Sequence, residues 1–275
     1  MQLPVNWAQL PPQTVLEIAP YALSDTIDNR VRCLEILCSS EQVVALLDMT
    51  HKEVNNILPQ LNWIYIEPLT EPVVNGFWLG EDFLLLPQTQ LKCCNLIEWI
   101  YAESAFDEIT GTGAFDKYPP NAAAIDKLIL ALCRPKDANL DMDSPHWQGD
   151  MREYFSPILN ERREKSKKMD SVPLNFKCFF LLFYLGCKKY IQKQYSILFS
   201  SDSMSADEQQ STIDYFSSPM PNFGWTGLLF DLAETGLFGD NTATQYTDLH
   251  TILIYLSKKQ FEYREVKRKT KQNNK

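Results

Sequence analysis

The stretch from Leu174 to Cys187, LNFKCFFLLFYLGC, is the most lipid-like run in the chain, and it decides the fold class. A membrane-spanning helix needs about 20 apolar residues, which is more than this run supplies. Lys177 and Lys188 also bracket its apolar residues. We therefore predict a buried core helix, begun at Pro173 and continued toward Phe199, and no membrane segment.

The segments before this helix also carry helix signals. Ser156-Pro157 suits an N-cap followed by a first helical residue, ahead of the charged run from Asn160 to Lys168. Helical periodicity covers Thr89 to Phe106. A further helix is expected to begin at Pro119-Pro120 and to stop at Arg134-Pro135.

The N-terminal third is predicted to consist of several short helices. Asp25 is the expected cap of one of them, and the next begins near Ser39 or Ser40. Thr50 and Glu53 have the spacing of a capping box, in which each side chain satisfies a backbone N–H of the first turn.

The periodicity changes between residues 62 and 87. The run from Trp63 to Ile66 is β-branched and aromatic, and two apolar runs, Phe77 to Leu79 and Phe83 to Leu86, flank the turn Gly80-Glu81-Asp82. We expect a small β-hairpin or three-stranded patch near residues 62–87. It should cover one end of a helical core, because so small a sheet is not stable alone.

Beyond the apolar helix, composition breaks between Ser200 and Gln210, SSDSMSADEQQ. A helix follows from Phe223, with Gly236 placed as its C-terminal stop, and Thr247 is the expected cap of a final helix. The prediction is therefore a mainly α fold, a multi-helix globular bundle with the small β patch.

The same breaks predict the domain organisation. Residues 1–199 form a helical body with a small β insertion, and residues 200–222 form a linker or loop. Residues 223–275 form a C-terminal helical hairpin with a basic tail, either separate or packed with the body into one domain.

No residue pattern indicates catalysis, a cofactor or a metal. The histidines stand in separate contexts, at His51, His146 and His250. Adjacent Cys93-Cys94 lack the spacing of zinc ligands, and Gly111-Thr112-Gly113 lacks the Lys-Ser/Thr of a P-loop. The acidic loop with Asp137, Asp141 and Asp143 lacks the glycine and glutamate of a calcium loop. We predict a protein that is not an enzyme and has no cofactor.

Cysteine usage and the N-terminus bear on location. The chain has 7 cysteines, an odd number, and most lie in apolar runs, which is typical of reduced core thiols. The first residues, MQLPVNWAQLPPQ, show no basic segment followed by an apolar one, as a secretory signal requires. A cytoplasmic location is therefore expected.

Charge is distributed unevenly along the chain. Hydrophobic residues make up 45%, which excludes wholesale disorder, and the net charge of -9 argues against a surface that binds nucleic acid throughout. Between Lys258 and Lys275, however, eight basic residues face only Glu262 and Glu265, giving +6 there and -15 over the remaining residues. This tail is either a solvated, frayed helix end or a docking arm for an acidic partner, such as RNA or an acidic surface of another copy.

The stretch FGWTGLLFDLAETGLFG, from Phe223 to Gly239, and the helix after it resemble small helical tail-assembly proteins of phages and prophages of Bacteroidetes hosts. The matching positions are Trp225, Leu232-Ala233-Glu234, Gly236, Phe238-Gly239 and Tyr255-Leu256. Val5 to Leu10 and Asp126 to Pro135 are similar as well, with Cys133 where the pattern has Tyr. Together these segments cover less than a quarter of the chain.

The resemblance implies a non-enzymatic assembly chaperone or structural component of the tail. Its partner would be the tape-measure protein, whose long amphipathic helices need shielding, or another tail component, in the host cytoplasm or the virion. The candidate partner-binding residues are Trp225, Phe238, Lys258, Lys259, Arg264, Lys267, Arg268 and Lys269. The alternatives are a cytoplasmic adaptor and an enzyme whose site is assembled from distant residues.

Overall fold

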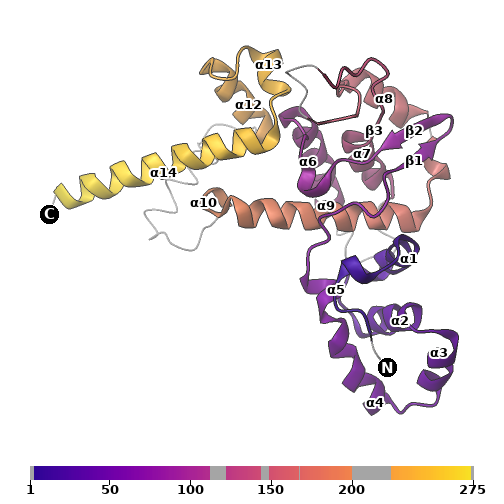
Figure 1. Ribbon diagram of the computed structural model, residues 1–275. Helices are drawn as coiled ribbons and strands as arrows, with labels where there is room; N and C mark the ends of the chain where they lie inside the picture. The colour runs from indigo at the N-terminus through magenta and orange to yellow at the C-terminus, as the bar shows by residue number, and fades with distance from the viewer. Residues whose placement is uncertain (1–2, 112–121, 144–148, 167, 200–223, 274–275) are drawn as a thin grey trace. The chain divides into compact units, whose positions relative to one another are not determined.

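The computed structural model describes residues 3–111, 122–143, 149–166, 168–199 and 224–273 (Figure 1). The fold is mainly α with a small antiparallel sheet, as predicted. The α-helices are α1 (Pro12–Ala22), α2 (Ile27–Leu37), α3 (Ser40–Leu47), α4 (His51–Ile57), α5 (Asn62–Ile66), α6 (Leu96–Gly111), α7 (Ala122–Leu132), α8 (Pro157–Lys165), α9 (Leu174–Gln194), α10 (Ser196–Phe199), α12 (Gly224–Glu234), α13 (Asn241–Gln245) and α14 (Leu249–Asn273). The 3-10 helices are η1 (Trp7–Gln9), η2 (Leu58–Leu61), η3 (Thr89–Leu91) and η4 (Lys168–Ser171), and the strands are β1 (Gly76–Leu79), β2 (Asp82–Leu85) and β3 (Arg134–Pro135).

The chain divides into two compact units, each made of two segments. Unit 1 comprises residues 1–91 and 101–189, and unit 2 comprises residues 92–100 and 190–275. The linker predicted at 200–222 lies outside the described residues.

Helix α9 is the core helix of unit 1, as its sequence predicted. Side chains on all of its faces are buried, as the consecutive residues from Cys178 to Leu181 show. It also approaches another backbone closely, because a Cβ at Gly186 would overlap the carbonyl group of Leu69. In the described part of the chain, no helix is long and apolar enough to cross a membrane.

Polar groups on α9 are satisfied by partners on α6. Glu103 accepts a hydrogen bond from the Tyr184 hydroxyl at 2.5 Å, and each of its oxygens lies 2.8 Å from the Lys188 nitrogen. The same ammonium lies 4.2 Å from the centre of the Phe106 ring. Tyr184 and Lys188 are one helical turn apart, so a single carboxylate on α6 holds both.

The sheet confirms the predicted hairpin and corrects its third element. Strands β1 and β2 pair antiparallel, with Trp78 opposite Phe83, and β3 joins the other edge of β2 through Arg134 and Pro135. The run from Trp63 to Ile66, expected in the β patch, is helix α5 instead. Trp63 and Ile64 are both buried there, so tertiary packing overrides their β propensity.

Several predicted helix ends are confirmed. Thr50 and Glu53 form a capping box, and Ser156 caps α8 with Pro157 as its first residue. The expected cap Asp25 is wrong by one residue: Thr26 caps α2, while Asp25 pairs with Arg30 at 2.5 Å.

The expected helix from Thr89 to Phe106 begins later, at Leu96. Gln90, Leu91 and Cys93, which precede it, have positive φ angles, which a right-handed α-helix cannot accommodate. Pro119 and Pro120 lie outside the described residues. Helix α7 ends at Leu132, before Arg134-Pro135 as expected, although these two residues then form β3.

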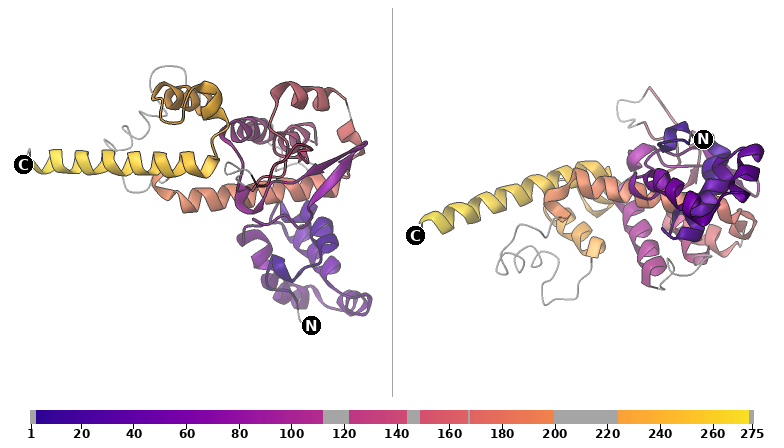
Figure 2. Two further views of the ribbon diagram at one scale, coloured as in Figure 1. Left: turned by 45° about the horizontal axis from the view of Figure 1, so that its top comes forward. Right: turned by 90° about the horizontal axis from the view of Figure 1, so that it is seen from below.

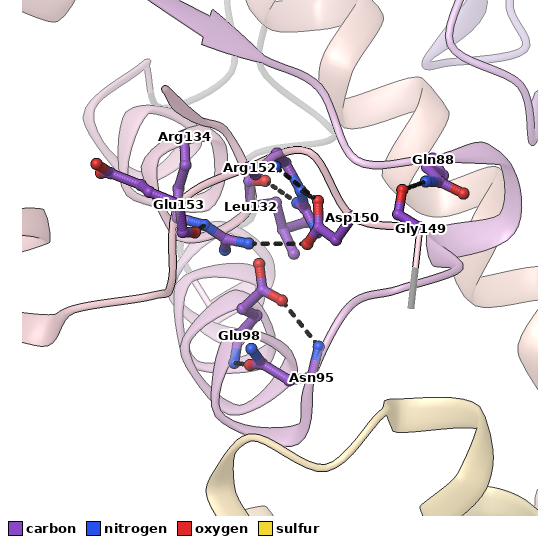
Figure 3. Close-up of polar contacts among 9 residues, drawn as sticks. All are labelled: Gln88, Asn95, Glu98, Leu132, Arg134, Gly149, Asp150, Arg152 and Glu153. Atoms are coloured by element: carbon purple, nitrogen blue, oxygen red, sulfur yellow. Dashed lines mark hydrogen bonds and ion pairs between the residues drawn. The ribbon is translucent and has the colours of Figure 1, made fainter. Parts of the chain in front are cut away.

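Two arginines, Arg134 in β3 and Arg152, are buried with their partners. Arg134 and Arg152 have 2% of their side chains exposed, and both lie against the Asp150 carboxylate, at 3.3 and 2.9 Å (Figure 3). Arg134 also donates to the carbonyl of Glu153, and Arg152 donates to that of Leu132. These hydrogen bonds connect the end of α7 and strand β3 to the segment of residues 150–153.

Candidate interaction surface

Unit 2 is built around a small apolar core between α12, α14 and the start of α6. Its fully buried members are Leu96, Leu228, Leu229, Leu232 and Ile252. Half-buried side chains pack against them: Ile100, Trp225, Phe238, Tyr255 and Leu256. This core holds the first half of α14.

Hydrogen bonds fix the first turn of α14. Asp248 caps the helix by accepting from the Thr251 backbone N–H at 2.8 Å, so the cap is Asp248 and the expected cap Thr247 is wrong. The N–H of Leu249 donates to the carbonyl of Cys94 at 2.8 Å, and the N–H of Leu96 donates to that of Thr247 at 3.0 Å. The start of α14 is therefore paired with the residues that lead into α6.

The start of α6 is itself capped. Asn95 and Glu98 form reciprocal bonds, at 3.1 Å from the Glu98 N–H to the Asn95 side chain and at 2.8 Å from the Asn95 N–H to the Glu98 carboxylate (Figure 3). This capping box satisfies two donors of the first turn. It is one more reason why this helix begins at Leu96 and not near Thr89.

The two aromatic residues among the predicted partner-binding residues take part in this core. Trp225 meets Trp99 edge to face, with ring centroids 5.7 Å apart, and Phe238 meets Tyr255 in the same way at 5.4 Å. Both Trp225 and Phe238 are only partly buried. They are placed to hold α12 and the turn after it against α14, and part of each ring faces solvent.

The six predicted cations all lie on α14. Lys258 and Lys259 share Glu262, at 3.9 and 3.2 Å, and Arg268 lies 3.4 Å from Glu265. The hydrogen bond to Glu262 raises the pKa of Lys259 above its ordinary value, so this cation stays protonated at neutral pH.

The remaining three cations have different surroundings. Arg264 donates to the carbonyl of Ile197 at 3.0 Å, which ties α14 to α10. Lys267 lies 5.9 Å from the centre of the Tyr263 ring, and Lys269 is exposed. The structure thus places all six cations on one helix, and it places Trp225 and Phe238 at the base of that helix.

The same part of α14 exposes apolar residues that sequence reasoning did not select. Phe261, Tyr263 and Val266 are 58%, 46% and 65% exposed. Figures 1 and 2 show α14 as one continuous helix whose second half runs past α12 and α13. The signal in the sequence was the interleaving of these residues with the cations, which is unusual for a purely solvated helix end.

Two buried thiols in the described residues are poorly suited to nucleophilic chemistry. Burial raises the pKa of Cys33 to about 11 and that of Cys178 to about 12, so both thiols stay protonated and poorly nucleophilic at neutral pH. Within the described ranges, no group of three or more His, Cys, Asp or Glu residues could hold a metal ion.

Comparison with protein-family models, with curated proteins and with solved structures gave no match.

Proposed function

We propose that the chain is a non-enzymatic protein of phage or prophage tail morphogenesis that binds another virion protein through the second half of α14. It would act in the host cytoplasm as an assembly chaperone or as a structural component. The observation that carries the proposal is the combination, on one helix, of six cations with exposed Phe261, Tyr263 and Val266.

Complementarity to the helix dipole does not account for these cations. That effect falls off within the last turn of a helix, whereas the basic residues begin at Lys258, several turns before α14 ends at Asn273. Solvation alone does not account for the exposed aromatic and aliphatic side chains. A binding role accounts for both, because charge steers a partner and apolar area holds it.

The resemblance to tail-assembly proteins supports the proposal through the elements that carry it. Its matching positions lie in α12, in the turn after it and in α14. Gly236 and Gly239 in that turn have φ of 67° and 92°, a conformation that favours glycine. The matched glycines therefore have a structural role in turning the chain from α12 toward α14.

The test is co-expression with the tape-measure protein that the proposal predicts in the same tail-gene cluster, followed by pull-down at low and high salt. We expect a salt-sensitive complex that the triple charge reversal Lys258→Glu/Lys259→Glu/Lys269→Glu abolishes. The matched control, Lys52→Glu/Lys92→Glu/Lys193→Glu, changes net charge equally at exposed lysines elsewhere and should keep the complex. Absence of a complex at low salt, or equal loss in both variants, contradicts the proposal.

A further inference from the structure

The apolar stripe that anchors α14 continues beyond its last buried residues. Leu249, Ile252 and Leu256 follow one another at intervals of three and four residues, and the first two are buried in unit 2. Tyr263 and Val266 return to the same face about two and three turns beyond Leu256, where they are exposed, and Lys259 occupies the stripe position between Leu256 and Tyr263. Such spacing is the pattern by which one helix packs along another, and a single polar residue inside the seam specifies how the partner aligns.

Charged residues lie in and beside this stripe: Lys259 is within it, and Lys267, Lys269 and Glu262 are at its edges. Lys267 lies 5.9 Å from the centre of the Tyr263 ring, and Lys259 lies 5.8 Å from that of Tyr255. Positions that flank an apolar helical seam choose a partner by charge. With three lysines and one carboxylate in or beside it, the seam is basic on balance.

The other exposed apolar residues lie on a different side of the helix. Ile254 and Phe261 are seven residues apart and share a face, which is about 120–180° from Val266 and Tyr263 at about 100° of rotation per residue. A helix that lies in a membrane surface has one broad apolar face. The arrangement on α14 favours a narrow protein seam.

The occupant of the seam is not a second copy of α14. Between residues 258 and 269 the helix carries six cations and two carboxylates, so two copies side by side would repel each other. The occupant therefore has to carry negative charge and an apolar stripe that packs on Tyr263 and Val266.

We infer that residues 259–270 of α14 bind an acidic amphipathic helix of another protein, whose apolar stripe packs on Tyr263 and Val266 and whose carboxylates face Lys259 and Lys267. The inference rests on the proposed role of α14 as the binding site, and it names the partner's chemistry. The helical form of the seam selects a helix, and the lysines in and beside it select carboxylates.

The experiment measures binding of the full chain to a labelled, designed helical peptide with Leu at heptad positions a and d and Glu at e and g, by fluorescence anisotropy. We expect binding that weakens with salt and weakens at least about tenfold in Tyr263→Ser/Val266→Ser. The matched control Ile254→Ser/Phe261→Ser removes equally exposed apolar side chains from the other face and should bind as the unaltered chain does.

A second pair of variants tests the charge border. Lys259→Glu/Lys267→Glu should weaken binding more than Lys258→Glu/Arg268→Glu, which makes the same charge change farther from the seam. Circular dichroism of each variant checks that α14 stays helical, so that lost binding is not lost folding.

Several outcomes overturn the inference. They are equal binding of a peptide with Lys at e and g, equal loss in the two serine variants, and tighter binding of double-stranded RNA or phosphatidylserine vesicles that depends on Tyr263 and Val266. If the acidic peptide fails while the tape-measure complex still depends on Lys258, Lys259 and Lys269, the inference is wrong and the proposed function stands. If the peptide binds as expected and no tail protein does, the proposed function is wrong and the inference about the partner's chemistry stands.

Discussion

Lys177 and Asp126 form an ion pair inside unit 1, with the ammonium nitrogen 2.6 Å from a carboxylate oxygen and only 7% and 14% of the two side chains exposed. Lys177 lies in the first turn of α9, and Asp126 lies on α7. The first turn of α9, the most apolar helix of the chain, therefore carries a buried lysine whose charge is neutralised by an aspartate on α7.

Removal of one member of this pair should destabilise the fold strongly. Lys177→Met leaves the Asp126 carboxylate buried without its cation, and we expect a loss of about 3 kcal/mol in the free energy of unfolding, measured with urea. The double variant Lys177→Met/Asp126→Leu should recover most of the loss, because no buried charge remains. A double variant as unstable as the single one would contradict this account.

The same pair predicts a pH dependence. Burial raises the pKa of Asp126 above its ordinary value of 3.8, and this outweighs the opposing hydrogen bond from Lys177. The folded state then binds the proton more tightly than the unfolded state, so this group's contribution to stability is lost as pH rises from 3.8 through the raised pKa. The stability of the unaltered chain relative to Asp126→Asn should fall over that range, in denaturant titrations at a series of pH values. A difference that rises with pH would show the opposite shift.

A methyl group should be tolerated very differently at two helical glycines. In Gly186→Ala the new Cβ overlaps the backbone of Leu69, and we expect a loss of about 2–3 kcal/mol, because neither backbone can yield without disturbing the packing of α9. At Gly111, the last residue of α6, a Cβ meets nothing within 4 Å. Gly111→Ala should leave stability unchanged or raise it by about 0.5–1 kcal/mol. Thermal unfolding of the two variants side by side decides the matter, and equal effects would exclude the close approach.

The cap of α14 can be assigned by substitution. Asp248→Ala should cost about 1 kcal/mol of stability, because the Thr251 N–H loses its side-chain acceptor. Thr247→Ala should cost less, since the Thr247 hydroxyl donates to the Ala243 carbonyl at 3.1 Å and does not cap the helix. Hydrogen exchange at the first turn of α14 should increase in Asp248→Ala, and an increase confined to Thr247→Ala would make Thr247 the cap.

Local signals in the sequence predicted the helices well where a capping residue or a long run of helical periodicity was present. The capping box at Thr50 and Glu53 and the Ser156-Pro157 start needed no knowledge of the rest of the chain. Trp63 to Ile66 failed because four β-branched and aromatic residues fit a buried helix turn as well as a strand. The third strand could not be foreseen, since Arg134 and Pro135 pair with a hairpin about fifty residues away in sequence.

The basic residues of the candidate surface could be predicted from the sequence, whereas its exposed apolar residues could not. The basic residues after Lys258 follow from counting, because cations are nearly always at the surface. Which aromatic residues are exposed depends on tertiary packing, which leaves Phe261 in solvent and packs Trp225 against Trp99. Local periodicity shows that both belong to helices, and it contains no information about where the neighbouring helix ends.

Because most of the cysteines are buried, the rate at which a reagent modifies each thiol reports local unfolding around it. Cys178 and Cys187 on α9, Cys133 after α7, Cys33 on α2 and Cys94 before α6 are buried, whereas Cys38 and Cys93 are only partly covered. A thiol reagent should therefore modify the second group quickly and the first group only when a unit opens. Mass spectrometry of the slowly labelled cysteines would report, residue by residue, which unit opens first, and would do so without any mutation.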